Sequence, residues 1–138
     1  MRKYFLVAIP VLALGMQLYR PERTNPPVQS RLETPPEVQA LLDRACADCH
    51  SHRTAWPWYS NVAPVSWLLA GHVREGREHL NLDQWPGGEK GGKLLGEMCE
   101  EVEKGAMPLP AYLRLHPAAR LTEADRKLLC GWTRAAAR

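Results

Sequence analysis

A chain of 138 residues, 45% of them hydrophobic, is long enough for one domain with a modest core. Its formal net charge of +3 is mild and no long basic run stands out, which excludes the charge pattern typical of nucleic-acid-binding proteins. Five tryptophans and twelve prolines, with one phenylalanine, favour short helices joined by ordered loops over a sheet protein.

The first element along the chain is an apolar stretch. Residues 4–18 carry no charge and follow a short positively charged start. This pattern is typical of an export segment, and Ala13-Leu14-Gly15 is an acceptable cleavage site. The stretch also comes close to the length of a membrane span, with Tyr19 and Arg20 at its far end. We therefore predict that residues 1–19 are a signal peptide or a membrane anchor. The remainder is expected in the periplasm, tethered to the inner membrane where the segment is retained.

A polar, proline-bearing segment comes next. Residues 20–33 are expected to form a linker or a strap that lies over the domain. The remaining residues, 34–138, are expected to form a single domain. Its first helix has Thr34 as the expected N-cap and Pro35 as the expected first residue. Apolar residues recur at helical spacing from there and lead directly into a pair of cysteines.

The pair belongs to the motif Cys46-Ala47-Asp48-Cys49-His50, which has the C-x-x-C-H spacing of c-type haem attachment. Two thiols three positions apart lie on one side of a helical turn, so both can form thioether bonds to the vinyl groups of one haem. The adjacent His50 then offers an imidazole nitrogen to the iron. A zinc site would need a second ligand pair at similar spacing, and a redox-active pair would need a βαβ context. Neither is visible, so we predict one covalently attached haem c per chain.

Met107 is the expected sixth ligand of the iron. It lies in the loop sequence Gly105-Ala106-Met107-Pro108, far along the chain from His50 and away from any apolar helical stripe. Ligation by one histidine and one methionine is typical of electron-transfer cytochromes c. Two alternatives stay open. His72 lies on the apolar stripe of a helix expected from Pro64 to about Leu80, and His116 precedes a proline in the same loop as Met107.

An aromatic segment, Trp56-Pro57-Trp58-Tyr59, follows the motif. It is expected to wrap an edge of the haem, to supply core area, or to do both. Arg53 or a tryptophan N–H group is a candidate donor to a haem propionate.

Two further helices are expected in the second half of the chain. One runs from about Glu89 to Lys104 with Gly105 as its C′ residue, and the last begins with a capping box at Thr122. The last helix is expected to pack beside the helix that precedes the motif. Cys99 and Cys130 lie on these two late helices, and they either form a disulfide or remain buried thiols.

The residues quoted above also carry a family resemblance. Residues 46–67 and the segment 20–27 resemble the bacterial haem-binding domain family with a single C-x-x-C-H, and the chain is more broadly similar to class I cytochrome c. The resemblance covers nearly the whole chain. It implies a small exported monohaem domain whose haem is held by Cys46, Cys49, His50 and Met107. The additional cysteine pair does not match the family pattern.

These observations predict an all-α, cytochrome c-like bundle of about four short helices around one covalently attached haem, preceded by an N-terminal apolar helix. The predicted function is one-electron transfer through iron ligated by His50 and Met107, with a redox partner protein and without a small-molecule substrate or catalytic residues. The alternatives are a haem-based sensor and a small peroxidase-type enzyme, both of which need an open or labile sixth position.

Overall fold

The computed structural model describes residues 2–137 and shows an all-helical protein, so the predicted fold class is confirmed. Met1 and Arg138, the outermost residues of the predicted segments, lie outside the described residues. The helices in chain order are α1 (Arg2–Met16), α2 (Pro36–Ala45), α3 (Ala47–His50), α4 (Val65–His79), α5 (Gly88–Glu103), α6 (Pro110–Leu115) and α7 (Glu123–Ala136). Two short 3₁₀ turns, η1 (Trp58–Asn61) and η2 (Pro117–Ala119), complete the described chain.

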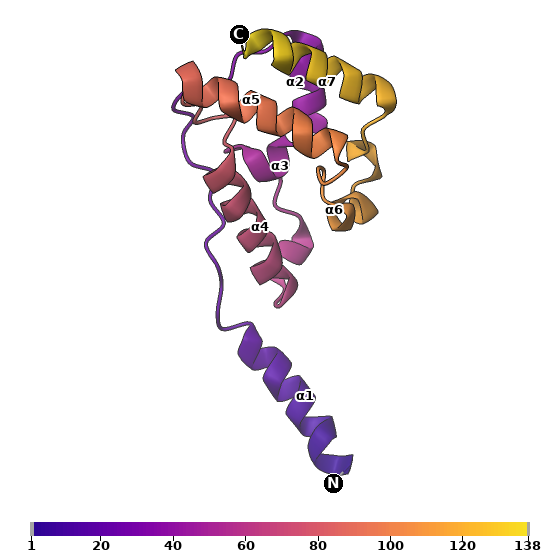
Figure 1. The fold of residues 1–138 in the computed structure, drawn as a ribbon. Helices are drawn as coiled ribbons and strands as arrows, with labels where there is room; N and C mark the ends of the chain where they lie inside the picture. Colours follow the sequence, from indigo (N-terminus) through magenta and orange to yellow (C-terminus); the bar gives the residue numbers. More distant parts are fainter. Residues whose placement is uncertain (1, 138) are drawn as a thin grey trace.

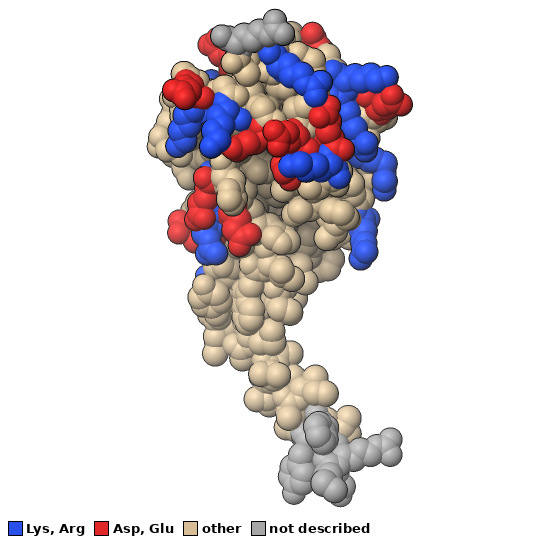
Figure 2. Space-filling view, viewed as in Figure 1, with Lys and Arg blue, Asp and Glu red and all other residues tan. Residues whose placement is uncertain are grey.

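Helix α1 extends away from the bundle (Figure 1). Its described apolar side chains, from residue 6 onward, are largely exposed, with Leu12 at 67% and Leu14 at 71%. Figure 2 shows the charged side chains gathered over the bundle, whereas residues 6–19 contain no charged side chain. Within residues 2–137, no helix combines the length and the apolar character that a bilayer crossing requires.

The segment after α1 is a strap, one of the two forms expected for residues 20–33. The backbone N–H of Leu32 donates to the carbonyl of Leu82 at 2.8 Å, and the N–H of Trp85 donates to the carbonyl of Ser30 at 2.7 Å. Nearer to α1, the Arg23 guanidinium donates to the carbonyl of Ser60 at 2.8 Å. These bonds attach the strap to η1 and to the loop between α4 and α5.

The hydrophobic core lies between α2, α5 and α7, with α5 and α7 side by side (Figure 1). Leu42 of α2 and Leu129 of α7 are fully buried in it, and α2 packs against α7 as predicted. A disulfide between Cys99 and Cys130 joins α5 to α7, with the two Cα atoms 5.0 Å apart. Of the two states expected for this cysteine pair, the structure has the disulfide.

Several helix boundaries agree with the sequence signals. Thr122 forms the predicted capping box, in which its hydroxyl accepts from the N–H of Asp125 and the Asp125 carboxylate accepts from the N–H of Thr122. Gly105 has a φ of +71° and lies directly after the α5 C-cap. Its N–H donates to the carbonyl of Val102, and the next N–H donates to that of Glu101, which is the Schellman arrangement.

Two details of the first domain helix differ from the prediction. Pro35, not Thr34, is the N-cap of α2, because a residue that precedes a proline avoids helical backbone angles and Pro35 precedes Pro36. The helix also does not continue through the motif. Cys46 interrupts it with a φ of −123°, and the separate turn α3 carries Cys49 and His50.

The described bundle therefore has more helices than the predicted four. Helix α6 was not expected, because six residues are too few to produce a recognisable apolar period. It lies in the segment after Met107 that the sequence predicted to be a loop. The short helix makes this segment a structured part of the domain.

Candidate haem site

One cavity of about 570 Å³ brings together all four residues predicted to hold the haem. Cys46, Cys49 and His50 line it from the junction of α2 and α3, and Met107 lines it from the segment before α6. His72 of α4 also lines it, so this alternative sixth ligand stays open. The volume is within the range of roughly 300–1,000 Å³ that is typical of cofactor and ligand sites.

His50 is held in one tautomer by the end of α4. Its Nδ1 lies 2.9 Å from the carbonyl oxygen of Gly76 and 2.9 Å from that of Leu80. A carbonyl can only accept, so Nδ1 carries the proton and Nε2 keeps its lone pair. Burial lowers the pKa of His50, although the two backbone hydrogen bonds act in the opposite direction. The ring is therefore oriented as a metal-ligating histidine is, with its second nitrogen bound to a carbonyl.

Gly76 allows α4 to approach the attachment segment closely. A Cβ atom at this position would lie 2.8 Å from the backbone oxygen of Cys49. That oxygen belongs to the main chain of α3 and cannot move aside as a flexible side chain can. The absence of a side chain at Gly76 thus places its carbonyl within reach of the His50 ring.

Gly76→Ala should lower the free energy of unfolding by about 1–3 kcal/mol, because the added methyl group overpacks against main chain. Gly71→Ala in the same helix is the matched control, since nothing lies within 4 Å of a Cβ atom there. That variant should be more stable by up to about 1 kcal/mol, through the higher helix propensity of alanine. Urea unfolding of the two variants measures both values. Equal shifts in the same direction would contradict the close approach.

The two motif cysteines are free thiols in the described structure. Burial, followed by the neighbouring Cys49, raises the pKa of Cys46 to about 12. Burial, followed by the charge of Asp48, raises the pKa of Cys49 to about 11. Both side chains are therefore protonated at neutral pH. Reactive C-x-x-C redox pairs have a lowered thiol pKa, so this environment argues against that alternative.

Met107 is half-buried and packs against the hydrophobic core. Its N–H and that of Ala106 both donate to the carbonyl of Glu101, at 3.2 Å and 3.0 Å. These bonds attach the start of the Met107 segment to the end of α5.

Tyr112 of α6 connects the same segment to the attachment motif. Its hydroxyl donates to Oδ2 of Asp48 at 2.7 Å, and Oδ1 of Asp48 accepts from the N–H of Ala55 at 3.0 Å. Burial, together with the hydrogen bond and charge of Asp48, raises the pKa of Tyr112. The phenol therefore stays a hydrogen-bond donor at physiological pH. Tyr112 also lines the cavity.

Other residues considered from the sequence lie elsewhere. His116 is not among the residues that line the cavity, and its ring stacks on Tyr112 with centroids 4.0 Å apart. Arg53 donates to Asp43 at 2.7 Å and to Asp83 at 3.2 Å. Trp58 is 78% exposed. This geometry gives no support to His116 as a ligand, or to Arg53 as a donor to a haem propionate.

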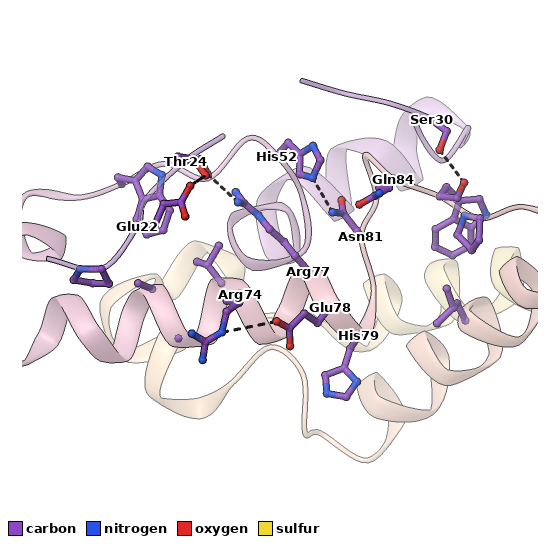
Figure 3. Close-up of a pocket in the computed structure, with 18 of the residues that line it drawn as sticks. Glu22, Thr24, Ser30, His52, Arg74, Arg77, Glu78, His79, Asn81 and Gln84 are labelled. Atoms are coloured by element: carbon purple, nitrogen blue, oxygen red, sulfur yellow. Dashed lines mark hydrogen bonds and ion pairs between the residues drawn. The ribbon is translucent and has the colours of Figure 1, made fainter. Parts of the chain in front are cut away.

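A second cavity, of about 990 Å³, lies between the strap and α4 (Figure 3). Arg77 crosses beneath the strap and donates to the carbonyl of Thr24 at 2.8 Å and to that of Ser51 at 2.8 Å. On the same side, Asn81 donates to Nε2 of His52 at 2.8 Å. None of the four residues predicted to hold the haem lines this cavity. Arg77 attaches the strap to the bundle here, and so does His52, whose Nδ1 donates to the carbonyl of Pro27 at 3.0 Å.

Sequence reasoning did not identify the residues that contact the predicted haem-binding residues. Gly76, Leu80, Asp48 and Tyr112 act through contacts between distant parts of the chain. Only Gly76 left a usable signal, since a glycine inside an otherwise helical pattern often marks a close approach.

A comparison with known protein families gives a match. The model of a haem-binding domain family matches residues 11–135, which include the motif, the cavity and the Met107 segment. No curated protein and no solved structure matches the chain. The donor set and the cavity are suited to the group that the family binds. The chain therefore belongs to the haem-binding domain family, and its cofactor is haem.

Proposed function

We propose that this protein is a monohaem c-type cytochrome that carries single electrons outside the cytoplasm. In this proposal Cys46 and Cys49 form the two thioether bonds, and His50 and Met107 ligate the iron. The observation that carries the proposal is the single cavity lined by all four side chains. The free Nε2 of His50, left by the two hydrogen bonds to its Nδ1, adds to it.

The bound haem supplies a one-electron change at its iron, and the protein determines the environment of that change. The carbonyls of Gly76 and Leu80 fix the direction of the His50 ring and increase the basicity of its free nitrogen. Buried apolar side chains such as Met98 and Val102 line the cavity and limit the access of water. With His50 and Met107 both holding the iron, the haem would need no substrate, and the partner would be another redox protein.

The same proposal includes the location of the protein. Residues 1–19 act as a signal peptide or an anchor, and the haem-binding domain, residues 34–138, lies in the periplasm. The exposed apolar side chains of α1 support this, because they need a partner other than water. The disulfide between Cys99 and Cys130 also supports it, because such bonds persist in oxidising compartments.

Protein produced together with the haem c maturation machinery should have the visible spectrum of a covalently bound, six-coordinate haem. Carbon monoxide should leave the reduced spectrum unchanged, because Met107 occupies the sixth position. Met107→Ala should bind carbon monoxide readily, and His72→Ala, the control in the same cavity, should behave as the wild type. Readily formed carbon monoxide adducts in the wild type would favour a sensor or a peroxidase-type enzyme. Absence of covalent haem would refute the proposal.

A further inference from the structure

The segment that carries Met107 is attached to the bundle at few polar points. At its start, Met107 is bound through its N–H to the carbonyl of Glu101. Beyond α6, the Arg44 guanidinium donates to the carbonyl of Ala118 at 2.7 Å. Helix α6 lies between these two points, and besides η2, the turn that follows it, it contacts the bundle through the side chains of Tyr112 and Leu113, which pack against the hydrophobic core.

Between these two points, a short hydrogen bond joins the Met107 segment to the proposed haem-attachment motif. The Tyr112 hydroxyl donates it to Asp48 at 2.7 Å. The neighbouring contact between His116 Nε2 and the Tyr59 hydroxyl is 3.5 Å long, at the outer limit for a hydrogen bond. Asp48 itself stands between the two attachment cysteines. The Tyr112 bond therefore joins the proposed sixth-ligand segment directly to the motif whose cysteines and His50 would hold the haem.

The chain between Met107 and Tyr112 is stiff. Two of its four intervening residues are Pro108 and Pro110, whose rings restrict the backbone. Pro110 also begins α6, so Tyr112 belongs to a helical turn that directly follows this short connection. A displacement of Tyr112 away from Asp48 would thus be transmitted to Met107 instead of being absorbed by the chain between them.

We propose that Tyr112 is a positioning residue whose hydrogen bond to Asp48 holds Met107 over the haem and so keeps the sixth coordination position closed. The inference rests on the proposed function, because it takes Met107 as the sixth ligand. In this proposal the sixth coordination position is in equilibrium between a closed state, with Met107 bound, and an open state that admits an external ligand. A hydrogen bond made only in the closed state shifts this equilibrium by its own free energy.

Tyr112→Phe removes only the hydroxyl and tests the inference directly. The affinity of the reduced protein for carbon monoxide should rise about tenfold, equivalent to about 1.4 kcal/mol. The charge-transfer band of methionine-ligated ferric iron should weaken in the same variant. Tyr59→Phe is the matched control, since it removes a hydroxyl beside His116 that makes no bond to Asp48. It should have the wild-type affinity and band.

A second variant distinguishes positioning from a general loss of stability. Asp48→Ala removes the acceptor of the same bond, so the double variant with Tyr112→Phe should bind carbon monoxide no more tightly than Asp48→Ala alone. Additive effects of the two substitutions would overturn the inference. Hydrogen exchange of the haem-free protein gives a readout that needs no iron, and the amides of residues 111–115 should exchange faster in Tyr112→Phe than in Tyr59→Phe.

The failures of the two proposals are distinguishable. A wild-type protein that has covalent haem but no methionine-to-iron band would overturn the assignment of Met107 and the role of Tyr112 with it. The other failure concerns Tyr112 alone. It occurs if the wild type has the methionine-to-iron band and the Tyr112→Phe variant equals the wild type in carbon monoxide affinity and in amide hydrogen exchange.

Discussion

A variant in which Cys46 and Cys49 are both alanine should contain no covalently attached haem, whereas the wild type should contain one haem per chain. Both thiols line the cavity next to His50, and neither is engaged in a disulfide. Thioether formation requires the sulfur atoms, so no other substitution should have so complete an effect on attachment. Haem staining after denaturing electrophoresis and the intact mass measure the result.

The second cysteine pair provides the control. Cys99→Ala combined with Cys130→Ala removes a disulfide that closes a sequence separation of 31 residues between α5 and α7. Chain entropy predicts a loss of about 3–4 kcal/mol of stability for a loop of this length. The variant should nevertheless carry its covalent haem, because neither Cys99 nor Cys130 belongs to the attachment motif. Covalent haem on the Cys46→Ala, Cys49→Ala protein would refute the attachment site.

Asp83→Ala should lower the free energy of unfolding by about 3 kcal/mol, the largest effect on stability that we expect from one substitution outside the core. The carboxylate is 0% exposed and accepts from Arg31 Nε at 3.1 Å and from Arg53 Nε at 3.2 Å. It also accepts from the N–H of His52 at 3.0 Å. One side chain thus joins the strap, the loop after the motif and the loop between α4 and α5.

The magnitude follows from what the substitution leaves behind. Removing one partner of a buried ion pair costs about 3–5 kcal/mol when the remaining charge stays buried. Here the side chains of Arg31 and Arg53 remain 48% and 33% exposed, so water can solvate both charges. We therefore expect a loss of stability at the lower end of that range, about 3 kcal/mol. The substitution also leaves the buried N–H of His52 without its acceptor. An unsatisfied buried donor lowers the free energy of unfolding, so the expected loss remains large.

Glu78→Ala is the matched control for Asp83→Ala. Its carboxylate forms an ion pair with Arg74 at 3.8 Å within α4, and both side chains are about two-thirds exposed or more, at 67% and 71%. Such surface pairs contribute about 0.3–0.5 kcal/mol. Urea unfolding of both variants should therefore give clearly unequal losses. Similar losses would show that the Asp83 cluster contributes no more than an ordinary surface pair.

The contribution of Asp83 should also depend on pH. Burial opposes its ionisation, but the hydrogen bonds from the His52 N–H and the Arg53 side chain lower its pKa overall. A carboxyl whose folded pKa is depressed contributes stability above its unfolded pKa, near about 3.9, and loses it as the pH falls through the folded value. The difference in stability between the wild type and Asp83→Asn should therefore be constant near neutral pH. It should narrow below about pH 4, as measured by urea unfolding at each pH.

Local sequence signals determined much of this protein. The C-x-x-C-H motif, the capping box at Thr122 and the Schellman glycine Gly105 depend on a few neighbouring residues, and each could be interpreted before the fold was known. The all-α class followed from periodic apolar residues and abundant prolines. Errors arose where local rules compete, as at Thr34, where the proline pair moved the helix start by one residue.

The tertiary structure decided what depends on distant residues. The His50 tautomer rests on carbonyls 26 and 30 residues away, and the contact between Tyr112 and Asp48 spans 64 residues. Packing also placed His72 and Met107 at the same cavity, left His116 outside it, and decided that residues 20–33 form a strap, one of the two forms expected. No periodic pattern encodes such pairs, because each partner satisfies only its own local rules. Their meeting follows from how α2, α5 and α7 bury their apolar faces together and from how α4 packs against α3 and η1.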